Sequence, residues 1–175
     1  MVSAKQFISQ LFLASALLAA GVGAAAAQPV TAGPASIEGT WRSLGGSEVT
    51  IQPCGEGYCG HLSWIVIPNE QWLVCSTMPA HMFAPLIQDY NNPDKAKQSR
   101  SLLGANILRV TATEEPDAYD AVVYNAEDGS TNAAKVWVEG GNLRLGGLCS
   151  GTICEVNQYW PRVADRRDAP GYSCG

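Results

Sequence analysis

The stretch "VTIQPCGEGYCGHLSW" (residues 49–64) places two alternating segments on either side of a glycine-rich turn. Apolar and polar residues alternate in each flank, which is the pattern of half-buried β-strands. Cys54 and Cys59 border "GEGY", and a four-residue hairpin loop would place them opposite each other, close enough for a cross-strand disulfide. The stretch therefore predicts a β-hairpin held by a disulfide.

The same alternation continues along the chain and predicts eight strands. Turn sequences such as "GGS", "EEPD", "EDG" and "EGG" separate nearly all of them. An antiparallel meander of eight strands can close into an up-and-down barrel and so remove its edges. The sequence therefore predicts an all-β fold, a single antiparallel barrel with strands over 39–44, 48–54, 58–67, 105–113, 118–126, 131–139, 142–149 and 152–163.

The first 27 residues (1–27) predict a secretory signal peptide that is cleaved near Ala27. Lys5 precedes an apolar run, and the small residues Ala25 and Ala27 occupy the positions that signal peptidase reads. The chain has a net charge of −5, and removal of Lys5 leaves 10 basic and 16 acidic residues, a net charge of −6. We expect a periplasmic or secreted protein with a flexible leader over 28–38, no nucleic-acid partner and no membrane-spanning segment.

All six cysteines lie in the exported part, and an even number in an oxidising compartment indicates disulfides. Zinc is disfavoured because His61 and His81 lack ligand spacing, and a thioredoxin-like redox centre is disfavoured because no Cys-x-x-Cys motif is present. We expect neither a metal nor a cofactor. The hairpin argument and the remaining pair predict three bridges: Cys54–Cys59, Cys149–Cys154 and Cys75–Cys174.

The link from Pro68 to Gly104 is longer than the other connections, and such links are often functional. Its first part, residues 69–88, is apolar and carries two prolines. Its second part, "DYNNPDKAKQSRSLLG" (89–104), predicts an Asx-rich turn and then about two turns of a short helix, with Asn92 or Asp94 as the cap.

Five segments, "GTW", "VTIQPCGEGYCGHLSW", "DYNNPDKAKQSRSLLGANIL", "VYNAEDGSTNAAKVWV" and "YWPRV", occur in this order. The set resembles the family called domain of unknown function 2147, small exported bacterial proteins with a lipocalin-like barrel, over roughly residues 39–163. The resemblance implies a fold more than an activity. Against the family pattern, residues 69–88 are an insertion and residues 164–175 an added tail, which Cys75–Cys174 would join. Asn125 and Gly147-Leu148 also depart from the pattern, so no shared ligand is carried over.

Gly39-Thr40-Trp41 resembles the Gly-x-Trp with which lipocalin-like chains begin. The first and last strands of a closed barrel are neighbours. We therefore expect Trp41 to cap one end of the barrel and Arg162 to stack on its indole. Gly39 would permit a close approach of the backbone there.

No catalytic motif is recognisable, because neither histidine lies in one and "EDG" (127–129) lacks the alternating oxygen ligands of a calcium loop. We therefore expect a non-catalytic binding protein, with an enzyme as a lesser alternative. Small eight-stranded barrels are filled by side chains or hold one small ligand. Aromatic residues on inward faces would line a cavity for a small, partly apolar ligand, or would simply pack the core. The candidate ligand-binding residues are Trp64, Tyr124, Trp137, Tyr159 and Arg100.

Arg100 has two interpretations: it bonds Asp89 or Asp94 and organises the Asx-rich turn, or it meets a ligand carboxylate. The insertion supplies another class of function, a periplasmic protein-interaction or envelope structural module. Its apolar side chains would form a docking surface or a lid if exposed, and would plug the barrel mouth if buried. They are Trp72, Leu73, Met78, Met82 and Phe83.

Overall fold

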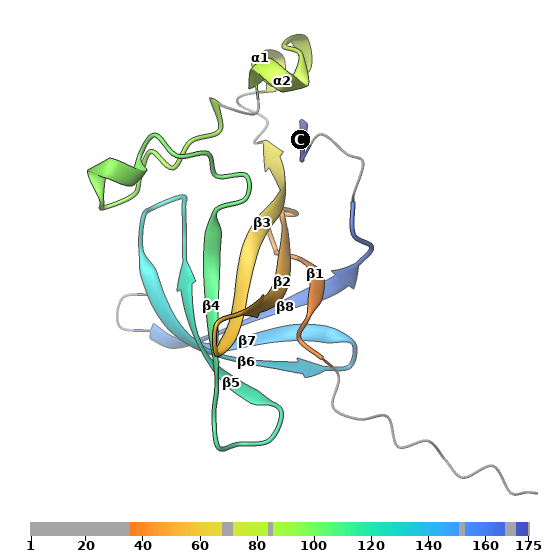
Figure 1. The fold of residues 1–175 in the computed structure, drawn as a ribbon, viewed down its shortest axis with the longest axis vertical. Coiled ribbons are helices and arrows are strands. Elements are labelled where there is room, and N and C mark those ends of the chain that lie inside the picture. The colour runs from red at the N-terminus through yellow and green to blue at the C-terminus, as the bar shows by residue number, and fades with distance from the viewer. Residues whose placement is uncertain (1–35, 68–71, 84–85, 151–152, 167–170, 175) are drawn as a thin grey trace, which may run out of the picture. The chain divides into compact units, whose positions relative to one another are not determined.

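The computed structural model describes residues 36–67, 72–83, 86–150, 153–166 and 171–174. The predicted signal peptide and most of the predicted leader lie outside these residues. The helices are α1 (Trp72–Thr77) and α2 (Ala80–Phe83), and η3 (Lys95–Lys97) is a 3-10 turn. The strands, arranged as in Figure 1, are β1 (Gly39–Arg42), β2 (Glu48–Cys54), β3 (Gly57–Ile67), β4 (Asn106–Ala112), β5 (Ala118–Tyr124), β6 (Thr131–Glu139), β7 (Asn142–Ser150), β8 (Ile153–Val163) and β9 (Tyr172–Cys174).

Strands β1 to β8 form a closed up-and-down barrel. Each strand from β1 to β7 pairs antiparallel with the next one along the chain. Strand β8 pairs antiparallel with β1 and closes the barrel, with Trp41 opposite Arg162 and Thr40 opposite Val163. The predicted all-β barrel of eight antiparallel strands is therefore confirmed.

The core fills the end of the barrel at which β1 begins. Alternation sends every second side chain inward, so Ala134 and Val136 of β6 are buried in the core. Trp41 is fully buried and donates from Nε1 to the carbonyl of Ile37 at 2.8 Å. Ile37 is itself buried, although it falls inside the stretch predicted as a flexible leader. The ordered barrel therefore begins before β1.

The β2–β3 hairpin has a tighter turn than the sequence suggested. Cys54 lies opposite Gly57, so the predicted four-residue loop is wrong and the turn consists of Gly55 and Glu56. Gly55 has φ 60°, the conformation that the first central position of a type II′ turn requires. The predicted Cys54–Cys59 bridge is nevertheless present, and it joins residues on a diagonal whose Cα atoms are 5.6 Å apart.

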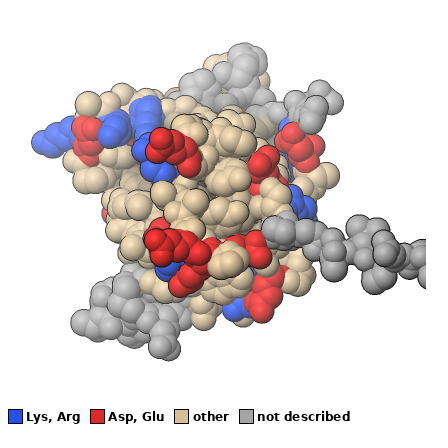
Figure 2. Space-filling view, turned by 60° about the horizontal axis from the view of Figure 1, so that its bottom comes forward, with Lys and Arg blue, Asp and Glu red and all other residues tan. Residues whose placement is uncertain are grey.

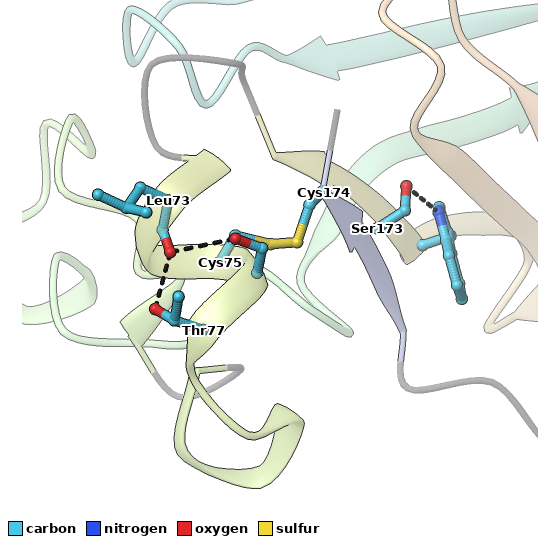
Figure 3. Close-up of a disulfide and its surroundings, with 7 residues drawn as sticks. Leu73, Cys75, Thr77, Ser173 and Cys174 are labelled. Carbon is cyan, nitrogen blue, oxygen red and sulfur yellow. Dashed lines mark hydrogen bonds between the residues drawn. A yellow bond between two sulfur atoms is a disulfide. The ribbon is translucent and has the colours of Figure 1, made fainter.

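The other two expected bridges have different outcomes. Cys149 and Cys154 are direct cross-strand partners between β7 and β8, as predicted, but their side chains lie outside the described part of the chain. The bridge between Cys75 in α1 and Cys174 in β9 is present, with Cα atoms 5.8 Å apart (Figure 3). The insertion and the tail are therefore joined covalently.

The tail adds strand β9, which the sequence did not predict because three residues carry no readable alternation. It runs parallel to the end of β3, with Ile65 opposite Tyr172 and Ile67 opposite Cys174. The Tyr172 ring packs on Phe83 of α2 with ring centroids 5.2 Å apart. Insertion and tail thus share a second small core beside the barrel.

The predicted helix in the connection is shorter than expected, because η3 is a single 3-10 turn. Asp94 is its cap and accepts from the Ala96 amide at 3.1 Å. Gln98 then donates to the Asn92 carbonyl at 2.9 Å, and the chain folds back so that Ser101 pairs with Gln88. These contacts turn the chain before a second helical turn can form.

Candidate functional site

A cavity of about 1190 Å³ enters the barrel from the end opposite to Trp41. Its rim consists of the β1–β2 loop, Phe83 and residues 86–91 of the connection, and the β5–β6 turn over 125–130. Inward positions of the strands supply its inner wall. These include Val49, Leu62, Ile107, Val123 and Trp160. A cavity of this volume, which includes its open mouth, is large enough for one small ligand.

Few polar groups interrupt the inner wall. Asn132 lies opposite Val123, and Gln158 accepts from the Trp160 indole at 2.9 Å. Glu127 and Asp128 lie at the rim, and the described residues that line the cavity include no lysine, arginine or histidine. The cavity is therefore apolar within and acidic at its mouth.

Asp89 organises the rim on the side of the connection. It is fully buried and accepts from the Tyr124 hydroxyl at 2.5 Å, from Asn92 Nδ2 at 2.7 Å and from Arg100 Nε at 2.9 Å. Arg100 also forms an ion pair with it at 2.7 Å. Every oxygen of this buried carboxylate thus has a partner, as burial of a charge requires.

The contacts of Asp89 also shift two pKa values. Burial alone raises the pKa of Asp89, but the hydrogen bonds from Tyr124, Asn92 and Arg100 outweigh burial and hold this pKa below its ordinary value of 3.8. Burial, followed by the hydrogen bond to Asp89 and the charge of Asp89, raises the pKa of Tyr124 to about 12. Asp89 is therefore charged and Tyr124 protonated at neutral pH.

Hydrogen bonds from Asn91 also join the connection to the β5–β6 turn. Asn91 Nδ2 donates to the carbonyl of Glu127 at 2.7 Å and to that of Ala126 at 3.3 Å. Gly129 has φ 75°, and a Cβ there would meet the Asn91 carbonyl oxygen, so a larger residue does not fit. Two walls of the mouth are therefore fixed to each other.

Among the predicted ligand-binding residues, Tyr124 lines the cavity, whereas Arg100 does not line it and binds Asp89. Arg100 forms an ion pair with Asp89, which agrees with the interpretation in which it organises the Asx-rich turn. Its guanidinium also lies 5.8 Å from the centre of the Tyr124 ring. The chain uses these predicted residues to hold the connection against β5.

Trp64 does not line the cavity. The Arg166 guanidinium lies 4.3 Å from the centre of its ring, and its indole donates to Ser173 at 3.2 Å. Arg166 also binds the buried Glu48, at 3.0 Å, together with Arg42 at 2.9 Å. Trp64 thus anchors the tail to the barrel wall.

Trp137 and Tyr159 lie on the outer face of the barrel. They flank Arg144, whose guanidinium lies 5.2 Å from the Trp137 ring centre and 3.8 Å from the Tyr159 ring centre. The three residues are cross-strand neighbours on β6, β7 and β8. Lys135 could have revealed this orientation, because it shares the face of Trp137 and a lysine is rarely buried.

At the closed end, the Arg162 guanidinium lies 4.1 Å from the centre of the Trp41 ring. It also donates to the carbonyls of Glu38 and Ser36 at 2.5 and 2.6 Å. Gly39 has φ 124°, and a Cβ there would meet Arg162 Nη1. All three residues lie at the seam between β1 and β8, and the group that approaches Gly39 is the Arg162 side chain.

The described residues also bear on metal binding, on the two histidines and on membrane-spanning helices. They contain no group of three or more potential metal ligands. His61 Nδ1 lies 3.2 Å from the Gly104 carbonyl oxygen, and the side chain of His81 lies outside the described part. None of the described helices has the length and apolarity needed to cross a membrane.

Comparisons with known proteins support the same fold. No curated protein matches the chain. Among solved structures, it is similar to the protein HP1028 from Helicobacter pylori, described as belonging to the lipocalin family, with 15% identity and a TM-score of 0.53 over 74% of this chain and 84% of that one. This likeness shows a lipocalin-like fold alone. Residues 39–162 match the family model DUF2147, described as "Uncharacterized protein conserved in bacteria", and the chain therefore belongs to that family.

Proposed function

We propose that this protein is a non-catalytic binding protein that holds one small, partly apolar ligand in the barrel. The observation that carries the proposal is the 1190 Å³ cavity with its mainly apolar inner wall. Tyr124 would meet the ligand at the rim, and Trp160 would meet it inside. The disulfides support an exported protein, which would meet such a ligand in the periplasm or outside the cell.

A titration with the neutral fluorophore Nile red tests this proposal. Val123 and Val122 are neighbours on β5, but Val123 lines the cavity while Val122 lies on the outer face and is 48% exposed. Val123→Trp should fill part of the cavity and weaken binding about tenfold or more, because an inserted ring overpacks the space that the ligand needs. Val122→Trp is the matched control and should bind like the parent. Equal binding by both variants would contradict a site inside the barrel.

A second candidate function uses the insertion as a docking surface for a protein partner. Leu73 and Met82 favour it, because their side chains are 68% and 55% exposed. Met78 and Phe83, in contrast, pack against the tail. Leu73→Ser with Met82→Ser should abolish crosslinking to a partner in periplasmic extracts without changing Nile red binding. Unchanged crosslinking would argue against this use of the insertion.

A further inference from the structure

The charged side chains among the described residues that line the cavity are all acidic. Glu127 and Asp128 are the acidic residues that line it, and the described lining residues include no basic side chain. Hydrogen bonds from the Ser130 side chain and backbone lower the pKa of Asp128, so this carboxylate stays charged at neutral pH. We propose that the cavity takes an amphiphile whose polar end is neutral or cationic and rejects one whose polar end is a carboxylate or a phosphate, an inference that rests on the proposed function.

Arg100, a described cation beside the mouth, is already paired with Asp89. Arg100 uses both Nε and Nη2 on Asp89, a buried carboxylate that would be left without its charged partner if Arg100 turned to a ligand. Breaking such a pair is costly, because it leaves an unpaired buried charge. Arg100 therefore does not serve as the counterion that a fatty acid or a lipid phosphate would need.

Several polar hydrogens at the mouth already have acceptors. The Tyr124 hydroxyl donates to Asp89, and Asn91 Nδ2 donates to the carbonyls of Ala126 and Glu127. Asn132 Nδ2 donates to the Ser130 hydroxyl at 3.3 Å. An anion that entered the mouth would lose its water and gain few donors from these groups, whereas an alcohol or an amide loses less on desolvation.

The two rim carboxylates add a smaller effect. Both are exposed, so water and salt screen their attraction for a cation. We therefore expect strong rejection of anions and only a modest preference for cations over neutral amphiphiles. Figure 2 shows acidic side chains at several places on one face of the molecule, so a test must separate the rim from the overall charge.

Displacement of Nile red by three ten-carbon amphiphiles tests the inference: decanol, decyltrimethylammonium and decanoate, each below its micelle concentration at pH 8. Decanoate should need about a tenfold higher concentration than decanol, because no cation in the lining meets its carboxylate. Displacement by decanoate at the concentration of decanol, or below it, would overturn the inference. Failure of Nile red itself to bind would instead overturn the proposed function.

Charge-neutral variants test the part played by the rim. Glu127→Gln with Asp128→Asn keeps the shape of both side chains and an acceptor for Ser130. It should weaken decyltrimethylammonium relative to decanol about two- to fourfold, the size expected for screened charges. Glu115→Gln with Asp117→Asn, in the β4–β5 turn at the opposite end, removes equal charge and should leave that ratio unchanged. An unchanged ratio in the rim variant, or an equal change in the control, would contradict the role of the rim.

Discussion

The guanidinium of Arg162 lies 4.1 Å from the centre of the Trp41 ring, across the seam where β8 meets β1. Trp41 is fully buried, while Arg162 covers its outer face and binds the carbonyls of Ser36 and Glu38. The pair therefore closes the barrel laterally and also ties down the residues that precede β1. The opposite end is left for the cavity.

This arrangement predicts an order of stability among three variants. Trp41→Ala should cost about 3–5 kcal/mol, because it empties a fully buried site. Arg162→Ala should cost about 1–2 kcal/mol through loss of the cation–π contact. Arg162→Lys should cost less than Arg162→Ala but more than nothing, since ammonium lacks the planar face. Urea unfolding with the bridges intact measures the order, and an Arg162→Ala variant that unfolds like the parent would refute the closing role.

The Asp89 cluster predicts a second group of stability effects. Asp89→Asn should cost about 3–5 kcal/mol, because Arg100 would lose the charge that its own partial burial requires. Tyr124→Phe should cost about 1.5–3 kcal/mol, the usual size of a hydrogen bond to a charged group. Urea unfolding at pH 7 measures both. If either change is neutral, the cluster does not hold the connection in place.

Acid should remove the contribution of Asp89. Its pKa in the folded protein lies below the ordinary value of 3.8, so its stabilising effect is complete above that value and is lost as the pH falls through the folded pKa. The difference in unfolding free energy between parent and Asp89→Asn should therefore shrink below pH 3.8. A difference that stays constant from pH 7 to pH 2 would contradict this assignment.

The link between tail and insertion predicts local loosening without loss of the barrel. A chain that ends before Tyr172 loses β9 and the bridge to Cys75, so amides of α1 and α2 should exchange faster. Strands β4 to β7 should keep their protection, because they make no ladder with β9. Cys75→Ser with Cys174→Ser separates the bridge from the strand. Equal protection of residues 72–83 in all three proteins would argue against the link.

The proposed export and the three expected bridges predict a defined mass. A periplasmic preparation should contain a chain that begins near Gln28 and lacks six hydrogens, two for each of three bridges. Cys149 and Cys154 are backbone partners in the β7–β8 ladder. The mass therefore tests whether their side chains form the third bridge. Alkylation of two or more cysteines in denatured, unreduced protein would disprove three bridges.

The strands were predictable because alternation and turn residues agree in almost every hairpin. The turn at Gly55 was not, because "GEGY" permits loops of two or four residues and the choice depends on pairing. Alternation also could not place Trp64, because the β2–β3 ladder shifts register between Glu48 and Val49. The hydrogen bond from Tyr124 to Asp89 could not be predicted, because the two residues lie 35 positions apart in the sequence. The cavity depends on how all of these elements meet.

Native mass spectrometry of the protein purified from the organism that makes it shows directly whether the barrel holds a ligand. We expect the parent to carry one organic molecule for each chain, which is released on denaturation. Val123→Trp should lose that molecule because its ring occupies the cavity, and Val122→Trp should keep it. A bare parent chain, or the same adduct in parent and Val123→Trp, would contradict a ligand held inside the barrel.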